Sequence, residues 1–281
     1  MKTSNEATKQ YVLMLSYGKD SLACLGAIKH LGWPLDRIVT AELWATDTIR
    51  AEYPPVVEFK EYVNAYIKKR YGITVEPYCA TKIYGVEKER VSYNDGFYYK
   101  IQNGKNAGII KGFPMQKGSW CKRLKLDALK DFSQQPGIVQ YLGIAADETE
   151  RIARYKDRAD IRLPLVELGW EQDLCGLWCK YSGILNPTYT TSTRDGCWFC
   201  HNQGVDKLRE LRKNYPELWA QLMEWDKVSP VTFKAGSGGK PGKTVHDFDR
   251  RFQMEDDGLI YPGDPWRWEY LDSEMVNLRL F

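Results

Sequence analysis

A short apolar run that ends in a glycine turn is the feature that most constrains the fold of this chain. Residues 10–15 read QYVLML, and the turn SYGKDS follows at residues 16–21. A run of this length bounded by a turn is typical of a buried strand in a parallel sheet. Apolar residues then recur at helical spacing over residues 22–31, until Gly32 and Pro34 end the pattern. The chain therefore begins with a strand, a tight turn and a helix.

The same alternation continues along the next part of the chain. The pattern predicts strands over residues 36–43 and 73–78, with an amphipathic helix over residues 55–71 between them. Strands that alternate with helices indicate an α/β fold built on a doubly wound parallel sheet. We therefore predict a doubly wound domain over residues 1–163 and a mainly helical, cysteine-containing region over residues 164–281.

Residues 81–116 interrupt this rhythm, because they are rich in Gly, Asn, Tyr and Lys and show little periodicity. We interpret them as an insertion or an active-site loop. A helix over residues 121–132 and a strand over residues 138–144 follow. Farther along, the pattern predicts helices over residues 171–181 and 205–225.

The composition is typical of a folded protein and gives no indication of a membrane-spanning segment. Ten tryptophans and eighteen tyrosines argue against disorder, since disordered segments lack such residues. The formal net charge of +3 is too small to demand a nucleic-acid partner. The chain holds no apolar run long enough to cross a bilayer, and its first residues lack the apolar core of a secretory signal. We therefore expect a cytoplasmic protein without a membrane partner.

The turn SYGKDS has the residues of an anion-binding loop. Gly18 allows the backbone to approach a phosphate closely, and Ser16 and Ser21 can donate hydroxyl hydrogen bonds. Lys19 supplies positive charge, while Asp20 can cap the helix or hold Mg²⁺. The alternative is a strand–turn–helix connection with no ligand, because short motifs often match by chance. The spacing of a Walker loop is absent.

The turn resembles the S-G-G-x-D-S loop of the PP-loop ATP pyrophosphatase superfamily, with Tyr17 in place of the first glycine. Three further segments resemble that superfamily in the same order: ATDTIRAEYP at residues 45–54, GSWCKRLKLDAL at 118–129 and YLGIAADETER at 141–151. Ala145 stands where the last segment usually has arginine. The stretch WCKYSGILNPTY at residues 178–189, with TRDGCWFC at 193–200, is similar to the phage and mobile-element branch of the phosphoadenosine phosphosulfate reductase family and also resembles the DNA phosphorothioation sulfurtransferase.

The resemblance implies a pocket for ATP, or for a related adenine nucleotide such as a PAPS-like sulfonucleotide, together with Mg²⁺. It implies that a substrate oxygen attacks the α-phosphate and that pyrophosphate leaves. The implied nucleotide-binding residues are Ser16, Gly18, Lys19, Asp20 and Ser21. The implied catalytic residues are Lys19, Asp20, Asp47 and Arg151. Further anion contacts, each equally well explained as solvated surface charge, are Arg123, Lys125 and Arg154.

Seven cysteines in a chain expected in the cytoplasm argue against a disulfide framework. Cys197 and Cys200 form a C-x-x-C pair that suits a shared metal ion. Cys175 and Cys179 fall one turn apart on a predicted helix. We interpret Cys24 and Cys79 as small buried hydrophobic residues, and Cys175 is open to the same interpretation. His201 is another candidate ligand, and the pattern leaves its role and that of Cys175 open.

The resemblance selects four of these cysteines as ligands of a 4Fe–4S cluster or of Zn²⁺: Cys121, Cys179, Cys197 and Cys200. Thiolates suit both groups, and the sequence does not separate them. The function that the resemblance favours is adenylylation of a substrate for sulfur transfer by an ATP-dependent sulfurtransferase. The alternatives are a sulfonucleotide reductase, which the lack of any cysteine after Cys200 disfavours, and a non-catalytic nucleotide-binding subunit with structural zinc. Candidate partners are a nucleic-acid acceptor, a cysteine-desulfurase-type sulfur donor and a second copy of the chain.

The last fifty residues contain a glycine-rich segment and a cluster of aromatic residues. Residues 234–243 (KAGSGGKPGK) are typical of a flexible loop. Trp266, Trp268 and Tyr270 are either a platform for stacking on single-stranded bases or a strand or lid packed on the core, and the second interpretation is favoured.

Overall fold

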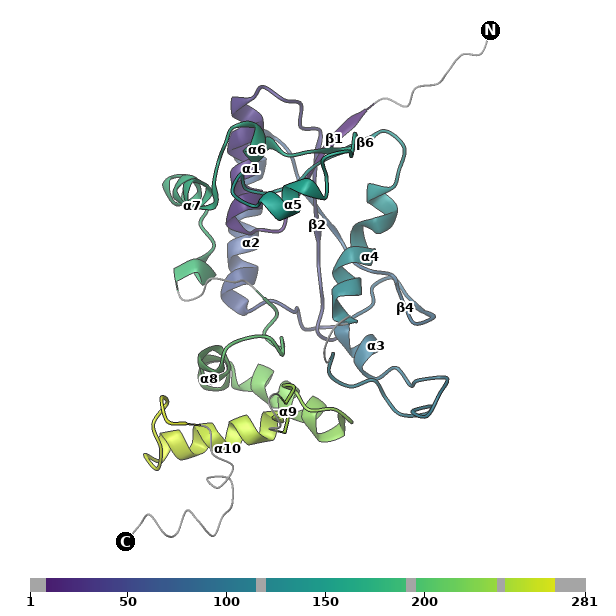
Figure 1. The fold of residues 1–281 in the computed structure, drawn as a ribbon, viewed down its shortest axis with the longest axis vertical. Coiled ribbons are helices and arrows are strands. Elements are labelled where there is room, and N and C mark those ends of the chain that lie inside the picture. Colours follow the sequence, from purple (N-terminus) through teal and green to yellow (C-terminus); the bar gives the residue numbers. More distant parts are fainter. Residues whose placement is uncertain (1–8, 115–119, 191–195, 237–240, 266–281) are drawn as a thin grey trace. The chain divides into compact units, whose positions relative to one another are not determined.

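The computed structural model describes residues 9–114, 120–190, 196–236 and 241–265 (Figure 1). The chain divides into two compact units, residues 1–93 with 122–197 and residues 94–121 with 198–281. This division differs from the predicted boundary at residue 163, since residues 164–197 belong to the first unit. Trp266, Trp268 and Tyr270 lie outside the described residues, as does the middle of the predicted loop over residues 234–243.

The first unit contains a parallel sheet of five strands in the order β3-β2-β1-β6-β7. Four strands follow the predicted apolar runs: β1 (Gln10–Met14), β2 (Arg37–Ala41), β3 (Val75–Tyr78) and β6 (Ile138–Tyr141). The fifth strand, β7 (Ile161–Arg162), is too short to show a pattern in the sequence. All four strand pairs are parallel, which confirms the α/β class and is compatible with a doubly wound sheet.

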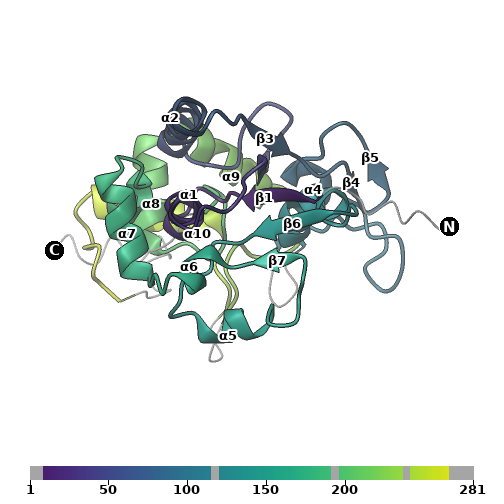
Figure 2. The same ribbon diagram turned by 90° about the horizontal axis from the view of Figure 1, so that it is seen from above.

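Helices cover both faces of this sheet (Figures 1 and 2). Leu13 of the central strand and Leu15 just after it pack in one core cluster, and Val12 packs in another, because successive side chains of a strand point to opposite faces. Phe132 of α4 (Cys121–Ser133) packs with Val12. The helices on the Leu13 face are α1 (Lys19–His30), α2 (Pro54–Tyr71), α6 (Pro164–Glu167) and α7 (Gln172–Tyr181).

Helix α1 is apolar on most of its circumference because α7 covers the side that faces away from the sheet. The approach is close: a Cβ atom on Gly26 would lie 2.4 Å from Cε2 of Trp178. Only glycine permits this contact between the two helices. The packing of α7 on α1 explains why residues 164–197 belong to the first unit.

The remaining elements of the first unit are short. The predicted insertion begins with the paired strands β4 (Lys82–Ile83) and β5 (Val86–Glu87), followed by α3 (Tyr93–Phe97) at the division between the units. A short helix, α5 (Thr149–Ala153), follows β6, and the 3₁₀ turn η1 (Pro187–Thr190) follows α7.

The second unit is built on three helices, α8 (Val205–Asn214), α9 (Pro216–Val228) and α10 (Val245–Asp256). The prediction of a single helix over residues 205–225 is wrong. Pro216 lacks an amide hydrogen and disfavours helical geometry in the residue before it, and Tyr215 has φ −137° and ψ 64°. Helix α10, which the pattern did not predict, begins with a capping box in which Thr244 and Asp247 exchange hydrogen bonds.

Aromatic rings make up much of the interior of the second unit. The rings of Trp198 and Trp225 stack with centroids 5.4 Å apart and planes 5° apart. Phe199 meets Trp225 edge-on, and the Trp225 indole donates a hydrogen bond of 2.7 Å to Asn94 Oδ1.

Among the residues that the structure describes, no helix has both the length and the apolar character needed to cross a bilayer.

Candidate functional site

The predicted phosphate loop lies where α/β sheets bind ligands. Strand β1 is the central strand and pairs with β2 on one side and with β6 on the other. The chain continues from β1 to β2 and β3 on the first side and later adds β6 and β7 on the second side, so the strand order reverses at β1. Such a reversal of strand order opens a crevice outside the carboxyl ends of the strands. Residues 16–21 occupy this position, between the end of β1 and the first turn of α1. The fold therefore directs the amino terminus of α1 at the crevice.

A buried hydroxyl holds the turn in shape. Ser21 Oγ donates to the Gly18 carbonyl oxygen over 3.0 Å, and it accepts hydrogen bonds from the amide and the hydroxyl of Ser16 at 3.2 and 3.0 Å. Ser21 is buried. Its hydroxyl thus ties both ends of the turn together, which differs from the direct phosphate contact that the sequence suggested.

Tyr17 has a backbone conformation that glycine adopts more readily than tyrosine. Its φ of 59° lies in the left-handed region that side chains seldom adopt. Three contacts hold it there: its hydroxyl donates to Asn64 Oδ1 at 2.7 Å, the Lys60 amine lies 4.9 Å from the ring centroid, and Asn186 Nδ2 donates to its carbonyl at 3.3 Å. Burial raises the pKa of the Tyr17 hydroxyl. The loop is thereby anchored to α2.

Gly143, just beyond β6, supports the loop from the other side. A Cβ atom at this position would lie 2.5 Å from the Ser21 amide nitrogen. Since no other residue fits without moving the backbone, this glycine lets the β6 connection press against the start of α1. It belongs to the segment at residues 141–151 that resembles the PP-loop superfamily.

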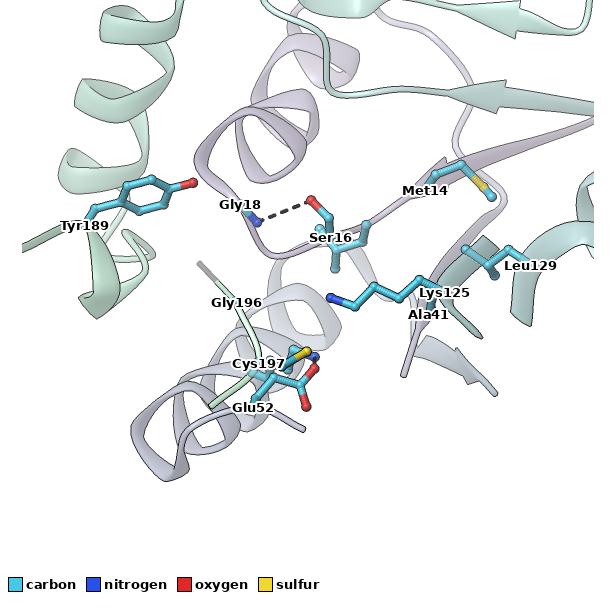
Figure 3. Close-up of a pocket in the computed structure, with 12 residues that line it drawn as sticks. Met14, Ser16, Gly18, Ala41, Glu52, Lys125, Leu129, Tyr189, Gly196 and Cys197 are labelled. Atoms are coloured by element: carbon cyan, nitrogen blue, oxygen red, sulfur yellow. Dashed lines mark hydrogen bonds and ion pairs between the residues drawn. The ribbon is translucent and has the colours of Figure 1, made fainter. Parts of the chain in front are cut away.

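A cavity of about 550 Å³ lies beside the loop (Figure 3). Its wall includes Ser16 and Gly18 from the turn, Lys125 from α4, and Tyr189 and Cys197 from the segment after α7. Met14, Ala41 and Leu129 supply apolar wall. In Figure 3 the Lys125 side chain extends from α4 toward the middle of the cavity. The size and the mixture of apolar wall with a few polar groups suit a small organic ligand.

Three polar residues of the cavity wall, Glu52, Lys60 and Tyr189, were not predicted from the sequence. Glu52 and Lys60 form a nearly buried ion pair of 2.6 Å. Tyr189 Oη accepts a hydrogen bond from the Lys19 amide at 3.4 Å, at the helix terminus where a bound anion is favoured. Glu52 belongs to the segment at residues 45–54, so the sequence could have indicated that it lies near the site, although not that it pairs with Lys60. No pattern in the sequence indicated that Tyr189 lines the cavity.

Several predicted site residues lie apart from the cavity wall that the described residues form. Lys19 Nζ pairs with Asp20 at 2.8 Å and donates to the Gln172 carbonyl at 3.1 Å. Gly18, not Asp20, is the N-cap of α1, so the capping role suggested for Asp20 is wrong. Asp47 is exposed and accepts from Lys88 at 3.0 Å, and Arg151 pairs with Glu148 at 2.5 Å.

Of the predicted nucleotide contacts, Ser16 and Gly18 line the cavity. Of the further anion contacts, Lys125 lines it and Arg123 and Arg154 do not, although all three side chains are exposed. The turn and α4 thus converge on one cavity although about a hundred residues separate them in the sequence.

The four predicted metal ligands are divided between the units: Cys179 and Cys197 belong to the first, and Cys121 and Cys200 to the second. The Cys179 thiol donates to the Lys19 carbonyl at 3.2 Å, and burial raises the pKa of the Cys179 and Cys175 thiols to about 12. Among the described residues, no three His, Cys, Asp or Glu side chains form a group that could hold a metal ion. The arrangement of Cys179 therefore suits a core thiol, and we derive no chemical step from a cluster or from zinc. Cys24 is buried as predicted.

No protein-family model matches this chain, and no curated protein sequence matches it.

Proposed function

We propose that the first unit binds ATP, or a related adenine nucleotide, with its phosphates at residues 16–21 and the rest of the molecule in the adjoining cavity. The proposal depends on one observation above all. The turn that resembles a phosphate loop lies at the reversal of strand order, and Ser16 and Gly18 of that turn line a cavity of about 550 Å³.

The electrostatics of this end of the sheet favour an anion. The amino terminus of α1 carries partial positive charge from amides that have no partner within the helix, and Lys125 brings a full charge to the cavity wall. The opposite charges of Glu52 and Lys60 largely cancel because the two groups lie 2.6 Å apart. Lys125 and the helix terminus are therefore the features of this wall that attract phosphate.

Tyr189 is positioned to respond to the nucleotide. Its hydroxyl accepts a hydrogen bond from the Lys19 amide, which is one of the donors that a phosphate oxygen would use. A bound phosphate would take over this amide, and Tyr189 would then donate its hydroxyl hydrogen to the phosphate or move aside. Either response leaves the amide satisfied.

For the reaction we propose adenylylation followed by sulfur transfer, as the resemblance to the PP-loop superfamily suggests. A substrate oxygen forms a bond to the α-phosphorus, the bond from that phosphorus to the bridging oxygen breaks, and pyrophosphate departs with the electron pair. Mg²⁺ on the phosphates, Lys125 and the α1 terminus would stabilise the charge that develops on pyrophosphate. The proposed acceptor is a nucleic acid, and the proposed sulfur donor is an enzyme of the cysteine-desulfurase type that carries a persulfide. The outer persulfide sulfur would bond to the activated atom as AMP leaves with the electron pair of the broken bond, and an external thiol would then reduce the remaining S–S bond and release the donor.

Isothermal titration calorimetry of the full-length protein with Mg²⁺ and ATP, AMP or inorganic pyrophosphate tests the binding step. We expect ATP to bind most tightly, because it alone fills both the phosphate loop and the cavity. Pyrophosphate should compete with ATP. A folded protein that gives no heat with ATP at millimolar concentration would refute the proposal.

A further inference from the structure

Helix α7 exposes a stripe of apolar side chains on the side that faces away from α1. Leu174, Leu177 and Tyr181 are 44%, 50% and 88% exposed. Cys175 and Cys179 of the same ten-residue helix are completely buried against the core of the first unit. The helix is therefore apolar on two faces, and its fold within the first unit accounts for only one of them.

The spacing of the stripe is that of a helix that packs against another helix. Leu174 and Leu177 are three residues apart, and Leu177 and Tyr181 are four apart, which gives the a, d and a positions of a heptad. Single exposed leucines are common on soluble proteins. A continuous stripe at heptad spacing is a different feature, because it offers a line of apolar contact to a partner helix.

Two charged residues flank this stripe on the same side. Asp173 and Lys180 are both exposed and lie two helical turns apart, each directly before an apolar a position. They therefore occupy successive g positions, and g residues contact g residues when two helices pack antiparallel. Opposite charges at successive g positions make the helix complementary to an inverted copy of itself.

We propose that α7 packs antiparallel against α7 of a second copy of this chain, around a two-fold axis. With Leu174 against the partner's Leu177, Asp173 lies beside the partner's Lys180. The symmetry repeats this ion pair, and Tyr181 lies over the partner's Trp170 at the end of the stripe. A parallel pair would not join Asp173 to Lys180, so the charges select the antiparallel arrangement.

The dimer should be weak. Helix α7 is ten residues long, or about 15 Å. One pair of such helices buries less than the roughly 1,200 Å² of a standard interface. We therefore expect an equilibrium between monomer and dimer over tens to hundreds of micromolar. This inference does not depend on nucleotide binding, so either proposal can fail alone.

Sedimentation velocity over protein concentrations from about 5 to about 500 μM tests the dimer, with charge variants at the flanking positions. Asp173→Lys makes both flanking positions basic, and Lys180→Asp makes both acidic. Each variant alone should dimerise about tenfold more weakly, because both ion pairs become repulsive. An equimolar mixture of the two variants should associate at least as well as the wild-type protein, since every g contact is then attractive. The double variant Asp173→Lys with Lys180→Asp should also restore dimerisation.

A matched control is Leu126→Glu on α4, where an isolated leucine is 70% exposed. It should leave association unchanged, whereas Leu177→Glu should abolish it. Circular dichroism verifies that each variant is folded. A wild-type protein that stays monomeric up to the highest concentration would overturn the proposal. So would a mixture of the two charge variants that associates no better than either alone, because that result excludes the antiparallel contact.

Discussion

The two compact units are stabilised by different kinds of side chain. In the first, aliphatic residues of parallel strands pack under helices on both faces of the sheet. In the second, Trp198, Trp225 and Phe199 form a cluster of rings, and Arg209 and Arg212 of α8 pair with carboxylates of α10. A parallel sheet creates a crevice at a reversal of strand order whatever its side chains are. The proposed nucleotide site therefore lies in the first unit, and we expect substitutions in the two units to affect different properties.

The largest effect should come from the aromatic cluster of the second unit. Trp225→Ala removes the stacked contact with Trp198 and the hydrogen bond to Asn94. We expect the free energy of unfolding to fall by about 3–5 kcal/mol, as measured by chemical denaturation. Tyr261→Ala, at an exposed aromatic residue, is the control and should change it by less than about 0.5 kcal/mol.

The comparison of the units predicts a second readout for Trp225→Ala. Because the proposed nucleotide site lies in the first unit, the variant should bind ATP as tightly as the wild-type protein under conditions where the protein is still folded. Loss of ATP binding by this folded variant would contradict the assignment to the first unit alone.

The converse substitution acts on the loop of the first unit. Gly143→Ala places a Cβ atom 2.5 Å from the Ser21 amide nitrogen and must displace the start of α1. Since small displacements of a binding group have large effects, ATP affinity measured by calorimetry should fall about a hundredfold. Gly176→Ala is the control, because its nearest neighbour outside the helix backbone is the flexible end of Lys19 at 3.8 Å. Equal affinities for the two variants would show that the loop geometry does not matter.

A smaller effect is expected from the charge at the cavity wall. Lys125→Ala should weaken ATP binding about tenfold, which corresponds to about 1.4 kcal/mol, with little change in stability. The loss should diminish at high salt because the contact is electrostatic. Lys130→Ala, on the same helix and exposed, should have no effect in the same titration. If both variants bind ATP like the wild-type protein, α4 does not contribute to the nucleotide site.

The smallest effect concerns the anchor of the loop to α2. Tyr17→Phe removes the 2.7 Å hydrogen bond to the half-buried Asn64 Oδ1, so the free energy of unfolding should fall by about 1 kcal/mol. Tyr62→Phe, at an exposed tyrosine of the same helix, should change it by only a few tenths. Denaturation curves of the two variants that coincide would remove the anchoring role from the Tyr17 hydroxyl.

The sequence predicted the sheet well because its strands are continuous apolar runs between turns, as in QYVLML before Ser16. It also placed the loop correctly at the end of β1. It did not predict β7, which has two residues, or the ion pair of Glu52 with Lys60, because no local pattern reports a pair of buried side chains. The break at Pro216 had a signal in the proline itself, which outweighs the apolar periodicity that continues on both sides.

Most residues of the cavity wall could not be predicted from local sequence patterns either. Lys125 and Tyr189 reach the loop through tertiary packing of α4 and of the segment after α7, and sequence spacing contains no distance between such segments. The position of Tyr17 in the left-handed region was equally hidden, since a tyrosine is a poor indicator of positive φ. Its role emerges only from its contacts with Asn64, Lys60 and Asn186.

Hydrogen–deuterium exchange with and without Mg²⁺ and ATP tests the central assignment most directly, because it compares the two units in one experiment. We predict slower exchange in peptides that cover residues 14–22 and 122–130, with no change in α8, α9 and α10. Slower exchange confined to residues 198–260, or equal rates at residues 14–22 with and without saturating ATP, would contradict the account.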